Sequence, residues 1–484
     1  KVVEDNRKPE AGTTFRRRAG CKSRRYWVGG RRGIRRSRKK PPQASGNELK
    51  EAVSESCSLP LAKGSTYDSF RFVLFRFKVE KRRRARGPEA KVKMLILMSD
   101  TGGGHRASAQ ALEAALEELF PERVEVTIVD IITEHSHWPY NASVPAYQYA
   151  AKNPWVWRAV YESGRFPPIR FLNGKVMSFQ NFGRFREGMQ RHSPDFVVSV
   201  HPLCQDLPLK VLNSMGPDKT RDIPFVTVVT DLGGAHPTWF NNQADKVFVA
   251  SDAVMRVAFR EGFSPAQALQ IHMLGLPTRP AFWKDSRPRA ELREELGLEV
   301  DAPTAMVMGG GDGVGGMGAI ATAVIDTLAR ELDQCQAIVI CGKNQVVKHK
   351  LEETQWPENS RVLIQGFVSN MDEWMGAVDA LVTKAGPGTI AEATIRGLPV
   401  MLSGHLPGQE EGNVPYVVNG GYGAYSKNPV EIGETVACWL KNPDLLQKMK
   451  AAALKAARPR ATYDIAREIA DMIFVEEENG TVKG

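Results

Sequence analysis

The sequence has no run of about 18 apolar residues, and its cysteines are few and scattered. The missing apolar run excludes a membrane-spanning helix, although attachment to a membrane surface stays open. Six cysteines stand at positions 21, 57, 204, 335, 341 and 438, without a CxxC pair or a metal-type cluster. This pattern argues against a disulfide framework or a zinc site, and it indicates reduced thiols in a cytosolic or plastid-like compartment.

Three motifs for binding phosphate or metal are also missing. No GxGxxG followed by an acid about 20 residues later occurs in a first βαβ unit, which disfavours a dinucleotide oxidoreductase. The absence of GxxxxGK[ST] disfavours a P-loop, and the chain contains no Asp-x-Asp triplet. A nucleotide-diphosphate leaving group would have to be stabilised by helix N-termini and side chains, so we expect no cofactor and no essential metal.

The positive charge is concentrated in the first 90 residues. Residues 1–90 hold 26 Lys or Arg against 9 Asp or Glu, whereas residues 91–484 hold 39 against 46, although the whole chain carries +10. Such basic runs are typical of a solvated, disordered arm, and an Arg-rich, acid-poor leader also suits an organelle transit peptide. Binding to nucleic acid or anionic lipid stays open, and "SFRFVLFRFKVE" favours an amphipathic strand or a surface anchor.

The 484 residues are too many for one core and predict two domains. Apolar runs alternate with helical patterns in two successive halves, which predicts an α/β fold of two Rossmann-like doubly wound parallel sheets facing across a cleft. We expect a first domain at 91–280 and a second at 281–484, with a linker near 275–288, and the last helix is a candidate to return to the first domain. The expected strands are 93–99, 123–131, 195–202, 224–231 and 246–251, then 303–311, 336–342, 361–367, 380–386 and 399–405.

A glycine turn followed by histidine, "SDTGGGHRAS", joins the first strand to the first helix. Glycine permits close approach of a ligand, and the free N–H groups of a helix start attract anions. His105 therefore stands at the mouth of a candidate site, where the helix start disfavours the imidazolium and helps to keep it neutral. The alternative is that His105 only caps the helix.

The segment "KAGPGTIAEA" has the same plan in the second half. The backbone N–H groups of Gly386 and Gly388, with the Thr389 hydroxyl, can hold a pyrophosphate without a metal. Glu392, one turn further, can accept from a ribose diol. An ordinary strand-to-helix turn with a capping Thr is the alternative.

Residues 132–192 form an insert that is longer than a crossover needs. It holds 12 of the chain's 39 aromatic residues, with 8 Lys or Arg against 3 Glu. This mixture is typical of a surface at the level of lipid headgroups, and single-stranded nucleic acid would use it through base stacking. Packing of a helical subdomain explains part of it in either case.

Six segments together carry a resemblance to a known family: "MSDTGGGHRASAQAL", "TDLGGAHPTWF", "MGGGDG", "KAGPGTIAEA", "RGLPVML" and "GQEEGNVPY". Their order between about 91 and about 475 resembles the monogalactosyldiacylglycerol synthases of plants and algae, which have the two-Rossmann GT-B glycosyltransferase fold. The resemblance implies inverting transfer of β-galactose from UDP-α-galactose to the sn-3 hydroxyl of diacylglycerol. It implies that His105 is the general base, with Asp231 as the alternative base or the group that orients His105.

The resemblance also implies contacts for both substrates. On the donor side it places Gly310, Gly311 and Asp312 before UDP, Phe367 and Val368 by the uracil, Gly386, Gly388 and Thr389 by the diphosphate, Glu392 on ribose, Gln409 and Glu410 on galactose, and Asn413 in support of that loop. On the acceptor and membrane side it places Gly103, Gly104, His135, Trp138, Pro139, His236 and Trp239. The sequence departs from the family where Asp312 replaces the usual Glu and where "TDLGGAHP" is richer in glycine.

By the same resemblance we expect a peripheral protein of the plastid inner envelope that is activated by anionic lipids. We expect no binding of nucleic acid, and whether the protein forms a homodimer stays open. Three alternatives remain at this point. They are a UDP-glucose or UDP-N-acetylglucosamine lipid glycosyltransferase, a non-hydrolysing UDP-sugar epimerase, and a nucleic-acid-binding protein that uses the basic leader.

Overall fold

The computed structural model describes residues 66–219, 221–284, 286–309 and 316–474. All of them belong to one compact unit, residues 60–484. The first 65 residues of the basic leader, which we expected to be disordered, lie outside the described residues.

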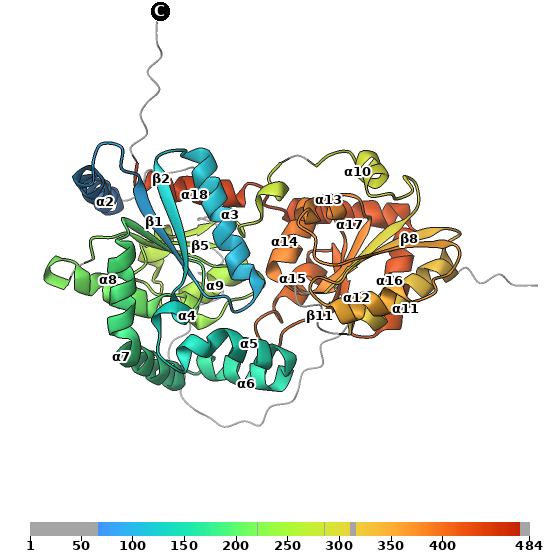
Figure 1. Cartoon of the computed structure of the whole chain (residues 1–484), viewed down its shortest axis with the longest axis horizontal. Helices are drawn as coiled ribbons and strands as arrows, with labels where there is room; N and C mark the ends of the chain where they lie inside the picture. The colour runs from blue at the N-terminus through green and yellow to red at the C-terminus, as the bar shows by residue number, and fades with distance from the viewer. Residues whose placement is uncertain (1–65, 220, 285, 310–315, 475–484) are drawn as a thin grey trace, which may run out of the picture. The chain divides into compact units, whose positions relative to one another are not determined.

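The first sheet has six parallel strands in the order β2-β1-β3-β4-β5-β6. Figure 1 shows β1 and β2 side by side in this sheet. The central strands are buried along their length because helices cover both faces, as their continuous apolar runs predicted. Their bounds are β1 Val92–Met98, β2 Val124–Asp130, β3 Phe196–Ser199, β4 Phe225–Val228, β5 Lys246–Val249 and β6 Ile271–Met273.

The second sheet is also parallel, in the order β12-β11-β10-β7-β8-β9. The bounds are β7 Thr304–Met308, β8 Cys335–Ile340, β9 Ser360–Gln365, β10 Ala380–Lys384, β11 Val400–Gly404 and β12 Gly423–Tyr425. This strand order reverses between β7 and β10, and ligands of doubly wound folds bind outside the carboxyl ends of the strands at such a point. The turn "KAGPGT" leaves β10 there.

The expected fold class of two doubly wound parallel sheets is confirmed. Each of the ten expected strands is present, and the sequence reading missed β6 and β12. Both are three-residue strands at a sheet edge. A strand that short carries no periodic pattern that would separate it from a loop.

Helices from both ends of the described chain cover the first sheet. One face carries α2 Thr66–Ala85, α3 Gly103–Leu119 and α18 Ala461–Asp471, and the other carries α7 Pro167–His192, α8 Asp206–Met215 and α9 Asp252–Arg260. Because Ile465 and Ile469 of α18 are fully buried in the core of the first sheet, the last helix crosses from the second half to the first.

The second sheet is covered in the same way. One face carries α10 Arg289–Glu295, α13 Met371–Gly376, α14 Pro387–Ile395 and α15 Asn413–Asn419, and the other carries α11 Met317–Glu331, α12 Gln345–Glu352 and α16 Pro429–Leu440. Helix α17 Pro443–Ala456 contributes buried residues to the cores on both faces.

The insert is helical. It comprises α4 Ile131–His135, the 3-10 turn η1 Tyr140–Ala142, α5 Ser143–Lys152, α6 Pro154–Arg165 and α7. Helices α6 and α7 each begin at a proline, whose fixed φ and missing N–H suit the first helical position. The remaining 3-10 turns are η2 Pro217–Lys219, η3 Pro237–Trp239, η4 Pro265–Gln270 and η5 Pro280–Phe282.

The segment expected as an amphipathic strand or a surface anchor is helix α2, so the strand is wrong and the surface anchor stays a prediction. The alternation in "FRF" suggested a strand, but Phe72, Phe75 and Val79 have helical spacing, and Phe75 and Val79 are only 3% and 1% exposed. Arg82 and Arg86 of this helix region bind the fully buried carboxylate of Asp195. The last part of the expected leader is therefore packed on the first sheet.

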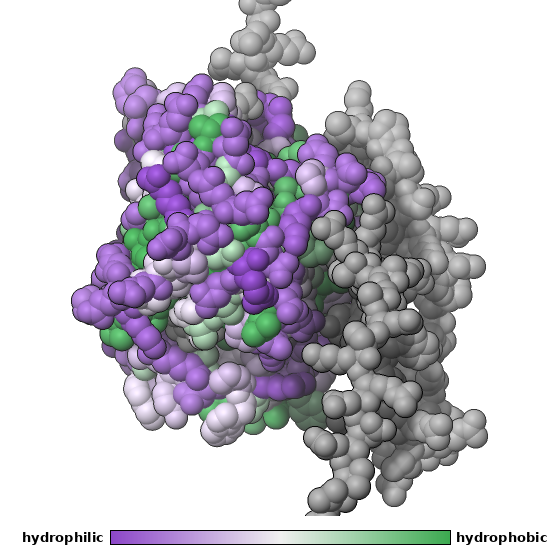
Figure 2. Space-filling view, turned by 90° about the vertical axis from the view of Figure 1, so that its right-hand side faces the viewer, coloured by the Kyte–Doolittle hydropathy of each residue, from purple (hydrophilic) through white to green (hydrophobic). Residues whose placement is uncertain are grey.

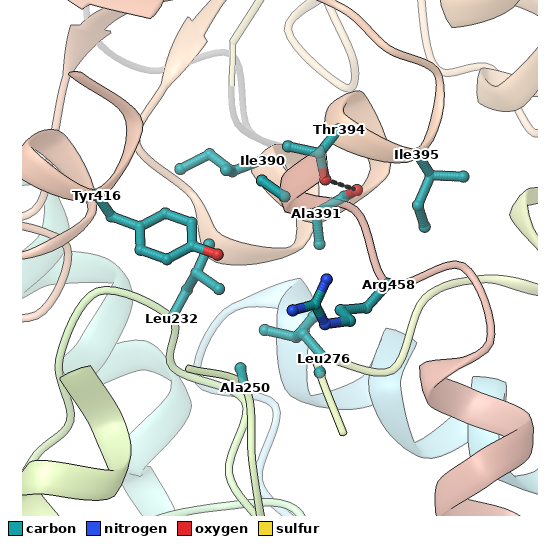
Figure 3. Close-up of a pocket in the computed structure, with 11 residues that line it drawn as sticks. Leu232, Ala250, Leu276, Ile390, Ala391, Thr394, Ile395, Tyr416 and Arg458 are labelled. Atoms are coloured by element: carbon teal, nitrogen blue, oxygen red, sulfur yellow. Dashed lines mark hydrogen bonds between the residues drawn. The ribbon is translucent and has the colours of Figure 1, made fainter. Parts of the chain in front are cut away.

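A small cavity lies between loops of the first half and helices of the second half (Figure 3). Leu232 and Leu276 line it from the first half, and Ile390 and Tyr416 line it from the second. Figure 3 shows Tyr416 and Arg458 with their polar ends turned toward the cavity. Apolar side chains of both halves thus meet directly behind the loops that carry the candidate site.

None of the described helices combines the length and the apolar character needed to cross a membrane.

Candidate active site

His105 lies in the first turn of α3, directly after β1, and is 7% exposed. Its Nδ1 lies 2.9 Å from the Val200 carbonyl oxygen and 3.0 Å from Thr230 Oγ1. Because a carbonyl oxygen can only accept, Nδ1 must carry the hydrogen and Nε2 must carry the lone pair. The ring is thus held as a neutral imidazole whose basic nitrogen is Nε2.

Burial keeps His105 neutral. It lowers the pKa of His105 to about 4, while the Val200 carbonyl and the charge of Asp100 act in the opposite direction. The sequence reading attributed the neutrality to the helix start, whereas desolvation is the larger cause. The capping alternative does not describe this residue, because the helix is capped at Gly102 without a side-chain bond and the His105 ring binds elsewhere.

A second histidine, His201, packs against His105 and was missed by the sequence reading. The two ring centroids lie 4.5 Å apart in a T-shaped arrangement. The Leu203 N–H donates to His201 Nδ1, and Nε2 lies 2.8 Å from the hydroxyl of Thr101 in the glycine turn. The available signal was the "SVHP" end of β3, since β3 pairs with β1 at the point where the strand order reverses.

Asp231 is buried at the end of β4 and accepts a hydrogen bond of 2.7 Å from the Trp239 indole N–H. Burial raises the pKa of Asp231 to about 7, against the Trp239 indole and the His236 backbone. Trp239 lies 6.0 Å from the His105 ring, centroid to centroid. Val200 and Thr230 therefore orient the His105 ring. Asp231 does not contact this ring directly, so its expected role as the group that orients His105 is corrected.

Two residues expected on the acceptor side have structural contacts instead. His135 packs on Gly188 of α7, where an added Cβ would lie 2.9 Å from the imidazole ring. His236 accepts from the Thr238 N–H at Nδ1 and donates from Nε2 to the Tyr161 carbonyl, so both nitrogens are engaged. His135 therefore packs two helices of the insert together, and His236 joins the insert to the loop after β4.

The other acceptor-side residues lie nearer the surface. Gly103 and Gly104 are exposed in the first turn of α3, and a Cβ on either would meet nothing within 4 Å. Trp138 is 77% exposed, and Pro139 follows it in the loop after α4. The start of α3 is therefore open to a ligand. The exposed side chain of Trp138 is available to insert into a membrane surface.

On the donor side, Lys384, Glu410 and Thr389 gather around Gly386. A Cβ on Gly386 would have a side-chain atom of each within 3.9 Å. Lys384 Nζ donates to Glu410 Oε1 over 2.7 Å, and the Leu406 N–H donates to Oε2 over 2.8 Å. The sequence reading missed Lys384, although it opens the "KAGPGT" turn and places a cation beside the expected diphosphate position.

Asn413 links the two halves at the site. Its Oδ1 accepts from the Gly233 N–H over 2.6 Å, and its Nδ2 donates to the Ala385 carbonyl over 2.8 Å. Gly233 and Gly412 also touch through their backbones, since a Cβ on Gly233 would lie 2.1 Å from the Gly412 oxygen. The loop after β4 and the loop after β11 are therefore in direct contact.

Glu392 is buried and already paired. Arg279 binds it with two hydrogen bonds of 2.7 Å, and burial raises its pKa against the effect of Arg279. Each carboxylate oxygen keeps a lone pair for a ribose hydroxyl. The sequence reading did not identify Arg279, which lies 113 residues from its partner.

The remaining donor residues are only partly brought together. Gln409 lies within the loop after β11, and its buried Oε1 has no hydrogen-bond partner among the described residues. Phe367 is 71% exposed after the edge strand β9, and Val368 packs on the core of the second sheet. Gly310, Gly311 and Asp312 lie outside the described residues. Within the described part of the chain no cluster of His, Cys, Asp and Glu has a metal-binding arrangement.

Two parallel six-stranded sheets with glycine-rich turns at their carboxyl ends give the chain the GT-B fold, which is the fold of GT-B glycosyltransferases. MurG of Acinetobacter baumannii has this fold, with a TM-score of 0.50 and 14% identity over 78% of this chain and 99% of that one. MnaA of S. aureus, solved with UDP, also gives 0.50, with 13% identity over 78% and 96%. A glycosyltransferase family 28 C-terminal domain model matches residues 304–462.

The monogalactosyldiacylglycerol (MGDG) synthase model matches residues 105–278. Monogalactosyldiacylglycerol synthase 1 of Arabidopsis thaliana, named chloroplastic, is 42% identical over 386 residues, which are 79% of this chain and 71% of that protein. The spinach (Spinacia oleracea) monogalactosyldiacylglycerol synthase, also named chloroplastic, is 41% identical over 390 residues, 80% and 73% respectively. The chain belongs to the monogalactosyldiacylglycerol synthase family, and the resemblance seen in its motifs is confirmed.

Proposed function

We propose that this protein transfers β-galactose from UDP-α-galactose to the sn-3 hydroxyl of 1,2-diacylglycerol and forms monogalactosyldiacylglycerol. The observation that carries the proposal is the fixed tautomer of His105. Its Nδ1 hydrogen is directed to Val200, which leaves Nε2 to accept the proton of an acceptor hydroxyl. Membership of the synthase family and the contact between the two glycine-rich loops support it.

The reaction is a single displacement at C1 of galactose. The acceptor oxygen attacks C1 opposite the diphosphate while Nε2 of His105 takes the hydroxyl proton. The bond from C1 to the diphosphate oxygen breaks, its electron pair leaves with UDP, and the configuration at C1 inverts. The negative diphosphate favours the imidazolium and so raises the low pKa of His105 when the donor is bound.

The turn before α14 and Lys384 stabilise the negative charge of the leaving group. The first N–H groups of α14 have no partner within the helix and favour an anion, and Gly386 gives the helix no side-chain cap. Lys384 adds a cation held in place by Glu410. On this basis we expect that a chelator leaves activity largely intact. Complete loss of activity that is restored by Mg²⁺ or Mn²⁺ would contradict it.

The insert is the proposed lipid-facing surface, because its helices expose many large apolar side chains. These are Trp138, Tyr149, Trp155, Val160, Phe166, Ile169, Phe171, Leu172, Val176 and Phe179. By contrast, the side of the molecule formed by the second sheet and its helices is mostly hydrophilic, with small separate hydrophobic areas (Figure 2). Rings and apolar side chains beside Lys and Arg suit a membrane that holds diacylglycerol and anionic lipids.

A peripheral protein of the plastid inner envelope, activated by anionic lipids, is consistent with this surface. The relatives named chloroplastic support the plastid, and the inner envelope is part of the proposal. Roles for Gly310, Gly311, Asp312, Gln409 and Glu410 at the donor remain part of the proposal as well.

The decisive experiment incubates the full chain with diacylglycerol in anionic-lipid micelles and one donor at a time. UDP-galactose, UDP-glucose and UDP-N-acetylglucosamine are compared, and the product is identified by mass and by the NMR signal of its anomeric proton. A β-galactosyl lipid made only from UDP-galactose establishes donor, acceptor and stereochemistry. Absence of glycolipid with every donor, while UDP still binds, would overturn the diacylglycerol acceptor.

A further inference from the structure

Helix α6 has an outer side and an inner side. Trp155 and Val160 are exposed on the outer side, while Tyr161 is partly buried on the inner side. The Tyr161 ring lies T-shaped against His236 with centroids 4.9 Å apart, and Trp157 packs next to it at 6.2 Å. Tyr161 is thus one point where the insert meets the loops of the candidate active site, beside Tyr147 at Gly102.

The ring of Tyr161 fills the place where a side chain at position 408 would stand. A Cβ added to Gly408 would lie 2.4 Å from Cδ1 of Tyr161, and the φ of Gly408 is +81°. Only glycine accommodates both the backbone angle and the contact. The insert therefore touches the backbone of the donor loop 405–412, immediately before Gln409.

The other end of this contact is fixed to the first half. His236 Nε2 donates to the Tyr161 carbonyl, and a Cβ on Gly164 would lie 3.0 Å from that same nitrogen. Gly233, three residues before His236, touches Gly412 at the far end of the donor loop. The donor loop is therefore held between Tyr161 on one side and Gly233 on the other.

One polar atom of the donor loop lacks a partner in the described part of the chain. The buried Oε1 of Gln409 has no hydrogen-bond partner there, although buried polar atoms in native proteins normally have one. Burial raises the pKa of Tyr161, and the negative charges of Asp231 and Glu411 act in the same direction, so its hydroxyl stays protonated. The loop that Tyr161 contacts at Gly408 thus carries, at the next residue, a buried acceptor without a partner among the described residues.

We propose that Tyr161 is a positioning residue for the sugar end of the donor: its ring sets the backbone at Gly408 and thereby aims Gln409 at the hexose. This inference rests on the proposed function and names the residue of the insert on which hexose binding depends. It also connects the helix that faces lipid with the loop that faces the donor.

The test compares binding of UDP-galactose with binding of UDP by calorimetry, because the ratio of the two Kd values isolates the contribution of the sugar. In Tyr161→Ala we expect Kd for UDP-galactose to rise about tenfold while Kd for UDP stays unchanged. Tyr161→Phe should restore binding, since the ring makes the contact with Gly408. Glu162→Gln, an adjacent exposed change on the same helix, is the control and should bind like the wild type.

Turnover gives the second readout. We expect Tyr161→Ala to raise KM for UDP-galactose about tenfold and to leave KM for diacylglycerol unchanged. Gly408→Ala pushes the loop from the other side and should raise the same KM, which keeps the test valid if Tyr161→Ala does not fold.

Failure of the inference and failure of the proposed function are distinguishable. If the wild type makes galactolipid and the variants bind UDP-galactose normally, only the role of Tyr161 is overturned. If the wild type makes no glycolipid, the proposed function is overturned. The ratio of the Kd values for UDP-galactose and UDP then still tests the role of Tyr161. If galactose adds nothing to binding in the wild type, the role of Tyr161 is overturned as well.

Discussion

At the scale of single residues, the site contains two buried groups with opposite pKa shifts, and both are candidates for the base. Desolvation favours the neutral form of each group, so it lowers the pKa of His105 to about 4 and raises the pKa of Asp231 to about 7. His105 has a free lone pair on Nε2, while Asp231 already accepts from Trp239. The geometry favours His105 as the base, and Asp231 as the group that fixes Trp239 beside it.

The first prediction concerns His105. His105→Ala should lower turnover by about 10²-fold or more, because the acceptor hydroxyl loses its proton acceptor. Binding of UDP should persist, since the residues expected to hold it belong to the second sheet, and calorimetry with UDP checks this. Turnover close to the wild type would remove His105 from the role of base.

The second prediction is the pH dependence. A base works only when deprotonated, so the rate falls as the pH drops through its pKa. With His105 as base, kcat/KM should fall only as the pH approaches about 4, and Asp231→Asn should leave this limb in place. A fall of kcat/KM near pH 7 that is absent from the pH profile of Asp231→Asn would identify Asp231 as the base. Circular dichroism at each pH separates titration from unfolding.

The third prediction concerns Lys384. Lys384→Met removes the cation beside the turn before α14 and should raise Kd for UDP about tenfold. Lys441→Met is the matched control, because Lys441 forms only an exposed ion pair with Glu331. Equal Kd values for the two variants would exclude Lys384 from the diphosphate site.

At the scale of elements, α2 belongs to the first domain although its composition resembles the basic leader. Val79 and Phe75 are buried, Arg82 and Arg86 neutralise the buried Asp195, and Lys78 pairs with Asp222. A chain cut at residue 91, the boundary expected from composition, would leave the buried Asp195 carboxylate without its two arginine partners, which is costly. A fragment for study should therefore begin before α2.

The fourth prediction tests this packing. Val79→Ala removes buried methyl groups and should lower the free energy of unfolding by about 2 kcal/mol. Val73→Ala is the same change at an exposed position of the same helix and should have little effect. Thermal or urea unfolding measures both, and equal stability of the two variants would mean that α2 does not pack as described.

At the scale of the whole molecule, the two halves are joined by contacts between distant segments. Helix α18 returns to the first sheet, Arg279 pairs with Glu392, and Gly233 meets Gly412 with Asn413 bridging beside them. The last contact places the loop after β4 next to the donor loop. In the proposed reaction, donor and acceptor must lie at short range, and this backbone contact holds together the two loops that are expected to bind them.

The fifth prediction uses two neighbouring glycines. A Cβ on Gly233 would lie 2.1 Å from the Gly412 oxygen, whereas a Cβ on Gly234 would meet nothing within 4 Å. Gly233→Ala should therefore separate the loops and lower kcat/KM by about tenfold or more, with Kd for UDP unchanged. Gly234→Ala should behave like the wild type, and the same loss in both variants would indicate a general effect of stiffening this loop.

The sequence by itself determined the features that depend on neighbours along the chain. Continuous apolar runs specified the ten longer strands, and the glycine turns before His105 and before Thr389 marked where ligands approach, because strand ends and helix starts are local events. The motif order identified the family. The short strands β6 and β12 and the helical state of α2 were not specified in this way, since three residues or an ambiguous period leave the choice to the neighbours.

The tertiary structure decided which side chains meet. His201 against His105, Lys384 with Glu410, Arg279 with Glu392 and Tyr161 over Gly408 each join residues far apart in sequence or in separate loops, and no local pattern encodes such pairs. Burial likewise made desolvation the main cause of the pKa shifts of His105 and Asp231. Desolvation depends on everything packed around a group, and only the folded chain brings that environment together.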